Sequence, residues 1–413
     1  MYSFLVPILI ALTLGYLATV IARLTGTVYI PYLLLLGIIF GPILYLINPN
    51  EAALLFYDYI GPIGAAFIIL AESSKIPRYL LRKVIKPLFL LLTFVLFATG
   101  IVVGLLLVLM IRAPLWVGFL VGAIISSTDP ASIIHSLKKL KVSDIPSTVL
   151  ITESVFNDPF SYLFLIVVIL IFFPENIGYV QSSIIHFSNI YVYIGMTQFF
   201  FPVVISVALF GLLFILRKYL PRDFKEYYTA IFLLFGLSSY SIATLSGGSG
   251  YMAVAIFGVL SGNFIPKDVE FENYKQFLDD VSSFVVIFIF VFLGASIDLQ
   301  FLEMYLIPGI IIALALIFVV RPLSVLLAGS IDRSVKYNDL LFIGLEGIRG
   351  VFPAILAPTV LIMGIGSGNL LLTYWGKAIE AIVLVIIFTS LTVQPLMMGR
   401  LLKALEDPKE KEI

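Results

Sequence analysis

Two short polar runs interrupt the apolar stretches of this 413-residue chain, and both contain carboxylates. The first is Ser126-Ser127-Thr128-Asp129-Pro130-Ala131-Ser132, and the second is Thr152-Glu153-Ser154-Val155-Phe156-Asn157-Asp158-Pro159. Carboxylate, hydroxyl and carbonyl oxygens are the ligands that hard cations prefer. A buried carboxyl also holds a proton readily, because a low dielectric favours its neutral form. The two runs therefore predict a site where a hard cation and a proton compete.

We expect Asp158 to bind either Na⁺ or H⁺, with further ligand oxygens from Asp129, Thr128 and Ser154. Ionisable residues inside an apolar segment usually mark an ion path or a proton relay. Glu72, at the end of another apolar segment, has two interpretations. It is either an ordinary interfacial carboxylate or an additional cation ligand that faces the same site.

The second run has two polar faces if it is helical. Glu153 and Asn157 are four residues apart on one face, and Ser154 and Asp158 share the adjoining face. Pro159 leaves the carbonyl of Val155 without its usual donor, which predicts a kink or a further ligand oxygen. For Glu153, a structural ion pair is the favoured interpretation.

Arg321 follows a long apolar run and needs an acidic partner. Glu153 is the best candidate, because Asp158 could not alternate between ions if an arginine held it. We expect a permanent Glu153–Arg321 pair that holds two helices together and stabilises the site.

Two regions are predicted to break a helix, the first polar run and a glycine-rich run further along the chain. Asp129 fits a helix N-cap and Pro130 the first helical turn, so the first run predicts a helix that stops and restarts within the membrane. The alternative is a polar loop end near the cytoplasm. The run Gly344-Leu345-Glu346-Gly347-Ile348-Arg349-Gly350-Val351-Phe352-Pro353 suits a second break, where Arg349 or Glu346 could balance the charges. Lys377 and Glu380, three residues apart, are expected to pair with each other.

The composition requires a membrane around these sites. Apolar residues make up 61% of the chain and charged residues 12%, and the mean hydropathy is +1.12. A soluble surface could not hide so much apolar side chain. The formal net charge of zero implies no nucleic-acid partner. With no cysteine and only His135 and His186, disulfides, thiol chemistry and Cys- or His-rich metal sites are excluded, and no cofactor is expected.

A spanning helix needs roughly 20 apolar residues, and about thirteen segments qualify or nearly do. They are 3–22, 28–48, 53–72, 86–111, 114–134, 145–173, 189–219, 226–245, 250–265, 278–298, 302–328, 337–363 and 369–402. We expect the first to be a membrane helix and not a cleaved signal peptide. The chain is thus predicted to be an all-α integral membrane protein, with one transmembrane domain over 1–402 and a charged tail at 403–413.

The basic residues set the expected orientation. Most of the 25 Lys and Arg residues fall in alternate loops or in the tail, whereas the other loops contain only Arg112. Basic loops are cytoplasmic by the positive-inside rule. The N-terminus should therefore lie outside and the C-terminus in the cytoplasm.

An odd number of helices allows two inverted six-helix repeats around a connecting helix at 189–219. The interrupted segments 114–134 and 337–363 are then the fifth helix of each half, the fifth and twelfth of the chain. Paired broken helices at corresponding positions point to a transporter's binding site.

These motifs together resemble the prokaryotic NhaP-type monovalent cation/proton antiporters. The resemblance rests on Ser127-Thr128-Asp129-Pro130, Glu153 to Pro159, Arg321-Pro322 and Gly347-Ile348-Arg349-Gly350, with Phe290 to Ala295 in addition. It implies a homodimer in the cell membrane of a prokaryote, in contact with membrane lipids. It also implies an interface part at about 1–72 and 226–298 and a mobile core part at about 86–173 and 302–402, which moves like an elevator.

The resemblance also implies roles for single residues. Asp158 looks like the family's ion-binding aspartate, and Asn157 like the partner that steadies the broken helix. Thr128 and Asp129 look like ligands at the helix break, while Glu153 and Arg321 look like the buried ion pair. Glu72 matches a carboxylate that only some prokaryotic members have. A role in pH homeostasis is implied for the whole protein.

We therefore expect a Na⁺ (or Li⁺)/H⁺ antiporter that is not an enzyme. Since Asn157 replaces a second acid beside Asp158, one proton per Na⁺ is predicted, which makes exchange electroneutral. A K⁺/H⁺ antiporter on the same scaffold is the nearest alternative, and a cation channel is a further one. Membrane proteases are disfavoured, because the Gly-x-Gly-Asp and His-Glu-x-x-His motifs do not occur.

Overall fold

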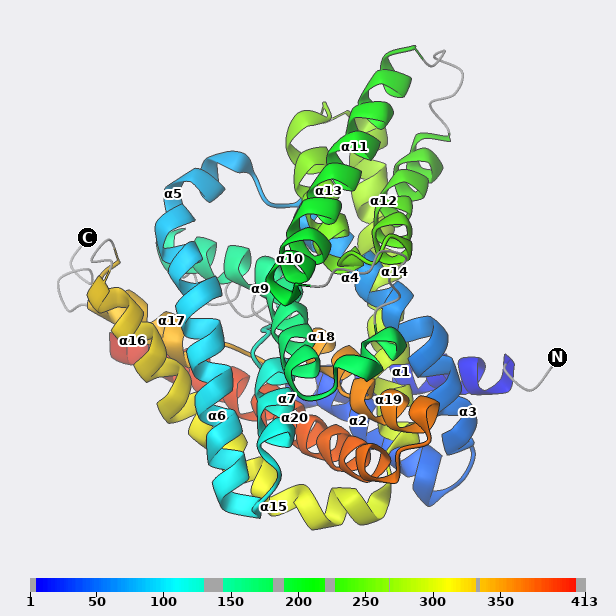
Figure 1. The fold of residues 1–413 in the computed structure, drawn as a ribbon, viewed down its shortest axis with the longest axis vertical. Helices are drawn as coiled ribbons and strands as arrows, with labels where there is room; N and C mark the ends of the chain where they lie inside the picture. Colours follow the sequence, from blue (N-terminus) through cyan, green and yellow to red (C-terminus); the bar gives the residue numbers. More distant parts are fainter. Residues whose placement is uncertain are drawn as a thin grey trace.

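The computed structural model describes residues 5–129, 144–180, 189–219, 227–266, 268–331 and 335–405, without the side chains of 144–145 and 398–405. These residues form helices joined by short connections, and no strand occurs among them (Figure 1). Nine of the helices described are long and apolar enough to cross a membrane, and four shorter apolar helices accompany them. The predicted all-helical membrane architecture is confirmed, whereas the number of crossings stays a prediction.

The described helices follow the predicted segments in order. They are α1 (Leu5–Thr25), α2 (Ile30–Ile38), α3 (Pro49–Leu54), α4 (Gly61–Ser74), α5 (Arg78–Leu90), α6 (Leu96–Ile111), α7 (Leu115–Ile125), α9 (Asp144–Phe172), α10 (Ile190–Ile194), α11 (Phe201–Tyr219), α12 (Tyr228–Leu245), α13 (Gly250–Phe264), α14 (Val269–Ser296), α15 (Leu299–Ala315), α16 (Arg321–Ile331), α17 (Tyr337–Leu345), α18 (Val351–Leu356), α19 (Thr359–Ser367) and α20 (Leu370–Leu405).

Several predicted spans consist of two helices joined through a wider π-helical turn. Such turns lie at Leu55–Ile60, Leu91–Val95, Gly195–Phe200 and Leu316–Val320, and another, Ile39–Ile43, forms the C-terminal end of α2. The turn at Leu55–Ile60 joins α3 to α4, and the one at Leu316–Val320 joins α15 to α16 and ends next to Arg321. π-Helical turns are frequent at functional sites, and both of these turns adjoin residues used below.

Some sequence predictions lie outside the described residues. The expected helix restart at Pro130, with Ala131 and Ser132, is one of them. Both histidines and many of the basic loop residues are others. What the structure describes of the first break is therefore its N-terminal half, from α7 to Asp129.

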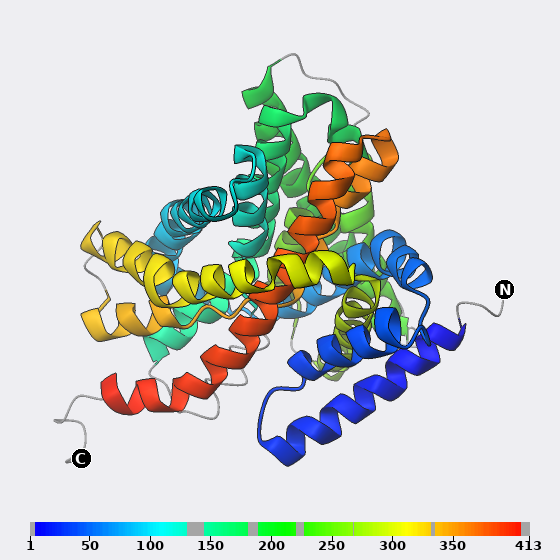
Figure 2. The ribbon, with the colours of Figure 1, turned by 90° about the horizontal axis from the view of Figure 1, so that it is seen from below.

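The helices pack as two groups that meet at the polar runs. In one group, α14 contacts α1, α2, α3 and α4, while α13 contacts α4, α11 and α12. In the other, α20 contacts α15 and α19, and α6 contacts α7. Figure 2 shows the N-terminal helices together on one side and α20 running diagonally across the molecule.

Helices α6 and α7 pack more closely than bulky side chains would allow. Gly100 and Gly104 of α6 face Gly122 and Gly118 of α7, and a Cβ on Gly104 would lie 2.6 Å from the carbonyl oxygen of Gly118. Small residues at such spacing let membrane helices approach backbone to backbone. This contact fixes α7, whose C-terminal end carries the first polar run.

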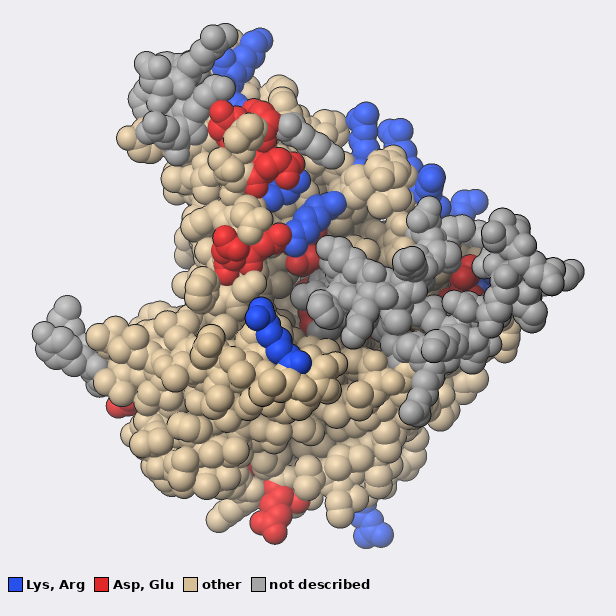
Figure 3. All heavy atoms as spheres, turned by 180° about the vertical axis from the view of Figure 1, so that it is seen from behind, with Lys and Arg blue, Asp and Glu red and all other residues tan. Residues whose placement is uncertain are grey.

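The distribution of charge matches a membrane protein. Figure 3 shows a broad belt of the visible face that is almost free of charged side chains, with most charges at one end of the molecule. Many large apolar side chains are exposed, for example Leu109 (78%) and Ile307 (69%). Lipid would cover this surface, since a soluble protein rarely exposes so large an apolar area.

Candidate ion-binding site

The two predicted helix breaks lie against each other at the meeting point of the two groups. Helix α7 ends at Ile125 and residues 127–129 are non-helical, while α17 ends at Leu345 and α18 begins at Val351. The backbone N–H of Asp129 donates to the carbonyl of Ile348 at 2.8 Å. This bond links the breaks and satisfies two buried backbone groups, which in a membrane must find partners within the protein.

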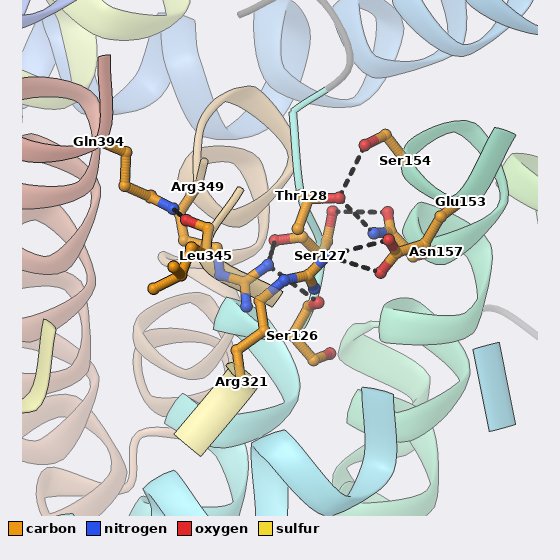
Figure 4. Close-up of polar contacts among 10 residues, drawn as sticks. All are labelled: Ser126, Ser127, Thr128, Glu153, Ser154, Asn157, Arg321, Leu345, Arg349 and Gln394. Atoms are coloured by element: carbon orange, nitrogen blue, oxygen red, sulfur yellow. Dashed lines mark hydrogen bonds and ion pairs between the residues drawn. The ribbon is translucent and has the colours of Figure 1, made fainter. Parts of the chain in front are cut away.

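Arg349 crosses from the second break to the first (Figure 4). Its Nη1 donates to the carbonyl of Ser127 at 3.0 Å and lies 3.4 Å from that of Ser126. The carbonyl end of a helix carries partial negative charge, which a guanidinium stabilises. Arg349 therefore lies where it could balance charge at the C-terminal end of α7, a role that sequence analysis left open between Arg349 and Glu346 and that stays a prediction.

Helix α20 supports the second break with two side chains that sequence analysis did not identify. The hydroxyl of Ser390 accepts a hydrogen bond from the backbone N–H of Arg349 at 2.9 Å and donates one to Gln394. The amide of Gln394 donates to the carbonyl of Leu345 at 2.8 Å, where α17 ends. The sequence signal that could have identified them is their four-residue spacing as polar residues in a long apolar helix.

Asp158 lies on α9, buried, and accepts a hydrogen bond from the hydroxyl of Ser127. Ser127 was part of the motif but was not among the predicted ligands. The described residues show no arginine or lysine within ion-pair distance of Asp158. Its carboxyl is thus held by a hydroxyl, which leaves it free to take a proton or a cation.

The remaining polar side chains of the two runs form a connected network. The amide of Asn157 donates to the hydroxyl of Thr128 at 2.6 Å, and this hydroxyl lies 2.8 Å from that of Ser154. Asn157 also accepts a 3.4 Å hydrogen bond from Ser127. Asn157 and Ser154 therefore tie the non-helical residues after α7 to α9.

A small cavity opens at this network. Its polar lining comes from Thr128, Asp129 and Asp158, and its apolar lining from α4, α18 and neighbours: Ala65, Ile68, Ile69, Val351, Phe352 and Ile355. Three of the predicted ligands therefore share one cavity. Ser154 does not line it and instead contacts Thr128.

Gly350 lies directly against Asp129. A Cβ at this position would lie between 2.5 and 2.7 Å from three side-chain atoms of Asp129. Glycine at the start of α18 therefore allows the second break to approach the carboxylate of Asp129.

Glu153 and Arg321 form the ion pair that sequence analysis predicted. Nη2 of Arg321 lies 3.0 and 2.9 Å from the two carboxylate oxygens of Glu153, and both side chains are 3% exposed. The pair joins α9 to the start of α16. It lies beside the site without including Asp158, so Asp158 can change its protonation state without breaking it.

Glu346 is buried at the end of α17, within range of the charge on Arg321. The ion pairs of the described residues do not include one between Glu346 and Arg349. Glu346 therefore belongs to the surroundings of the Glu153–Arg321 pair, and any role in charge balance at the crossing stays a prediction.

Glu72 lies at the end of α4, away from the cavity lining. Its carboxylate is 3.1 Å from Nζ of Lys75, which also lies 2.7 Å from Asp279. Burial lowers the pKa of Lys75, but the two carboxylates outweigh this effect and raise the pKa above its ordinary value. The role of Glu72 as a cation ligand therefore stays a prediction.

The prediction that Lys377 and Glu380 pair with each other is wrong. Nζ of Lys377 lies 2.9 Å from Asp298, and Glu380 accepts a 2.7 Å hydrogen bond from the phenol of Tyr57. Both partners come from distant segments that pack against α20. Local spacing placed the two residues on one helix face but could not reveal closer partners elsewhere.

The polar side chains that line the cavity all present oxygen atoms. The described residues contain no group of three or more His, Cys, Asp or Glu side chains of the kind that holds a resident metal ion. The two carboxylates and the threonine hydroxyl that line the cavity are oxygen groups of the kinds that hard cations prefer.

Comparisons with known proteins agree with this geometry. The family model described as "Sodium/hydrogen exchanger, transmembrane" matches residues 8–404. Na(+)/H(+) antiporter 1 of Methanocaldococcus jannaschii is 35% identical over 85% of this chain and 82% of its own length. The K(+)/H(+) antiporter NhaP of Alkalimonas amylolytica is 28% identical, and 59% of its length is covered. The solved structure of the sodium proton antiporter MjNhaP1 from M. jannaschii at pH 8 superposes with a TM-score of 0.82 at 32% identity, covering 96% of this chain and 97% of that one.

Proposed function

Because this chain belongs to the sodium/hydrogen exchanger family, we propose that it is a secondary active antiporter that exchanges Na⁺, or Li⁺, for H⁺. The observation that carries the proposal is the burial of Asp158 in a cavity shared with Asp129 and Thr128, without a basic partner among the described residues. A transporter, not an enzyme, fits this family and this oxygen-lined cavity.

The coupling follows from competition for one carboxylate. Burial favours the protonated form of Asp158, whereas a bound Na⁺ favours the ionised form. Either ligand neutralises the side chain, so the loaded site can cross the membrane while the empty, charged site cannot. One carboxylate beside Asn157 gives one H⁺ for one Na⁺.

The other site residues have supporting roles in this mechanism. Asp129, the carbonyl or hydroxyl of Thr128, and Ser154 complete the Na⁺ ligands once Ser127 yields Asp158 to the ion. Glu72 is proposed to be an additional cation ligand. Asn157, Glu153 and Arg321 keep the broken helices in place.

Alternating access is proposed to occur between the two helix groups. The core part at about 86–173 and 302–402 carries Asp158 and would move against the interface part at about 1–72 and 226–298. The interface part would form a homodimer in the plasma membrane of a prokaryote. The distribution of basic residues supports an external N-terminus and a cytoplasmic C-terminus.

Transport by purified protein in liposomes with an internal pH dye tests the function. Na⁺ or Li⁺ added outside should drive H⁺ out of the lumen, and K⁺ should do so weakly. Asp158→Asn should abolish exchange, while Asp280→Asn, a matched change at an exposed carboxylate on α14, should leave it intact. A response to K⁺ alone would favour a K⁺/H⁺ antiporter, and cation flux without H⁺ movement would indicate a channel.

A further inference from the structure

Glu380 is a buried carboxyl that the exchange mechanism does not use. It lies on α20 within the span Leu370–Met397 and is 2% exposed. It does not line the cavity of Asp158. An ionisable group at such a position is costly and usually has a function that involves a named partner.

The partner is Tyr57. Its phenol donates a 2.7 Å hydrogen bond to Oε1 of Glu380 across 323 residues of sequence. Tyr57 belongs to the π-helical turn Leu55–Ile60 and lines a second, larger cavity together with Asp58 and the tyrosines Tyr162, Tyr240 and Tyr251. Tyr57 therefore connects the buried carboxyl to a polar cavity through which protons can reach it.

The other charges near Glu380 act on it in opposite directions. Lys377, one turn earlier on α20, and Asp298, at the start of α15, both act on Glu380, but they lie 2.9 Å from each other as an ion pair. Ser296, at the end of α14, contacts Tyr57. An ionised Glu380 thus depends on the phenol of Tyr57 for stabilisation.

This hydrogen bond joins the two helix groups. Helix α20 packs on α15 and α19, whereas the turn Leu55–Ile60 packs on α4 and α14. Any displacement of one group against the other separates Tyr57 from Glu380. Separation leaves an ionised carboxylate without its donor inside the protein, which is far less favourable than leaving a protonated carboxyl there.

We propose that Glu380 is a second proton-binding site, separate from Asp158, and that its protonation releases the contact with Tyr57 so that the two helix groups can move. The ionised form holds the groups together and slows exchange as pH rises. This inference rests on the proposed exchange function, but the binding of the proton can be measured without transport.

Infrared difference spectroscopy during a pH titration of the protein in lipid detects the proton directly. The Asp158→Asn variant should retain protonated carboxyl bands that titrate, and the difference between its spectra and those of the Asp158→Asn/Glu380→Gln double variant should contain the band of Glu380. Tyr57→Phe should move the titration of Glu380 upward by about one pH unit. The lost charge-assisted hydrogen bond stabilises the ionised carboxylate, and its removal should change the protonation equilibrium by roughly tenfold. Identical spectra with and without Glu380→Gln would overturn the proposal.

The pH profile of exchange in liposomes gives the second readout. Glu380→Gln should move the decline of exchange rate to higher pH, and Tyr57→Phe should do the same, because both variants remove the contact that holds the two helix groups together. Glu303→Gln, a matched change at an exposed position of α15, should keep the wild-type profile. Unchanged profiles in Glu380→Gln and Tyr57→Phe would contradict the release mechanism. If the wild type performed no Na⁺/H⁺ exchange, the function proposed above would fail while the infrared result still decided whether Glu380 binds a proton.

Discussion

At the scale of residues, the site is built from hydroxyl groups that connect two polar runs. Ser127 contacts Asp158, and Thr128 contacts Asn157 and Ser154. Helical spacing predicted which residues of the second run share a face. It could not predict that Ser127, rather than Thr128, contacts Asp158, because residues 127–129 are non-helical and their side-chain directions depend on the neighbouring break.

The partner of Arg321 could be predicted because a buried arginine requires an acidic partner. Glu153 was the best candidate, because an arginine bound to Asp158 would have prevented Asp158 from alternating between ions. The partners of Lys377 and Glu380 were not predictable, since Asp298 and Tyr57 approach from segments that the sequence alone does not place beside α20.

The Glu153–Arg321 pair leads to a prediction about stability. Glu153→Leu should destabilise the protein by about 3–5 kcal/mol, because it leaves a buried arginine without its countercharge. The double variant Glu153→Leu/Arg321→Met should regain much of this loss, since apolar residues can replace a buried pair. Thermal unfolding in detergent followed by fluorescence measures both changes.

The pair of Lys275 and the exposed Glu272, 2.8 Å apart on α14, is the control for this experiment. Glu272→Leu should change stability by less than about 1 kcal/mol. Equal losses in the single Glu153→Leu variant and the double variant would show that the buried charges do not depend on each other.

At the scale of elements, both helix breaks could be predicted from Gly, Pro and Asp inside apolar segments. The contacts that hold the two breaks in place could not be predicted. The crossing bond from Asp129 to Ile348 and the support from Ser390 and Gln394 are long-range contacts, and nothing in local sequence pairs α20 with the second break.

The close approach of the two breaks leads to a prediction at Gly350. A methyl group there would press on the carboxylate of Asp129, so Gly350→Ala should raise the Na⁺ concentration for half-maximal exchange by about tenfold, equivalent to ~1.4 kcal/mol of cation binding. Proteoliposome exchange over a range of Na⁺ concentrations measures this shift.

Gly211→Ala is the matched control, because a Cβ on this glycine of α11 meets nothing within 4 Å. It should leave exchange unchanged and stabilise the helix slightly. A Gly350→Ala variant with wild-type Na⁺ dependence would remove Asp129 from the cation site.

At the scale of the whole molecule, the membrane architecture was the most predictable feature, because a span needs a long apolar stretch and composition leaves no alternative. Segment boundaries were less predictable. The chain often passes through a π-helical turn or a short helix, and four apolar helices of the described chain are shorter than a full span. The two-group packing depends on contacts such as those of α14 and α20, which no local pattern specifies.

The stoichiometry is a property of the whole transport cycle. If Asp158 alone carries charge, one Na⁺ replaces one H⁺ and no net charge crosses the membrane. Exchange in liposomes should then be independent of a K⁺/valinomycin diffusion potential, and the Na⁺ gradient that balances a pH gradient should equal it in size. A voltage-dependent balance point would require a second charge, with Glu72 and Asp129 as the first candidates.

The central claim is that Na⁺ and H⁺ occupy Asp158 in turn, and proton release on cation binding tests it most directly. Na⁺ added to purified wild-type protein in weakly buffered detergent solution should release protons. The release should be strongest at the pH where Asp158 is protonated. The control variant Asp280→Asn should release as many protons as the wild type. Asp158→Asn should release none. Proton release of wild-type size from Asp158→Asn, or Na⁺ binding by the wild type with no proton released across the whole pH range, would contradict the account.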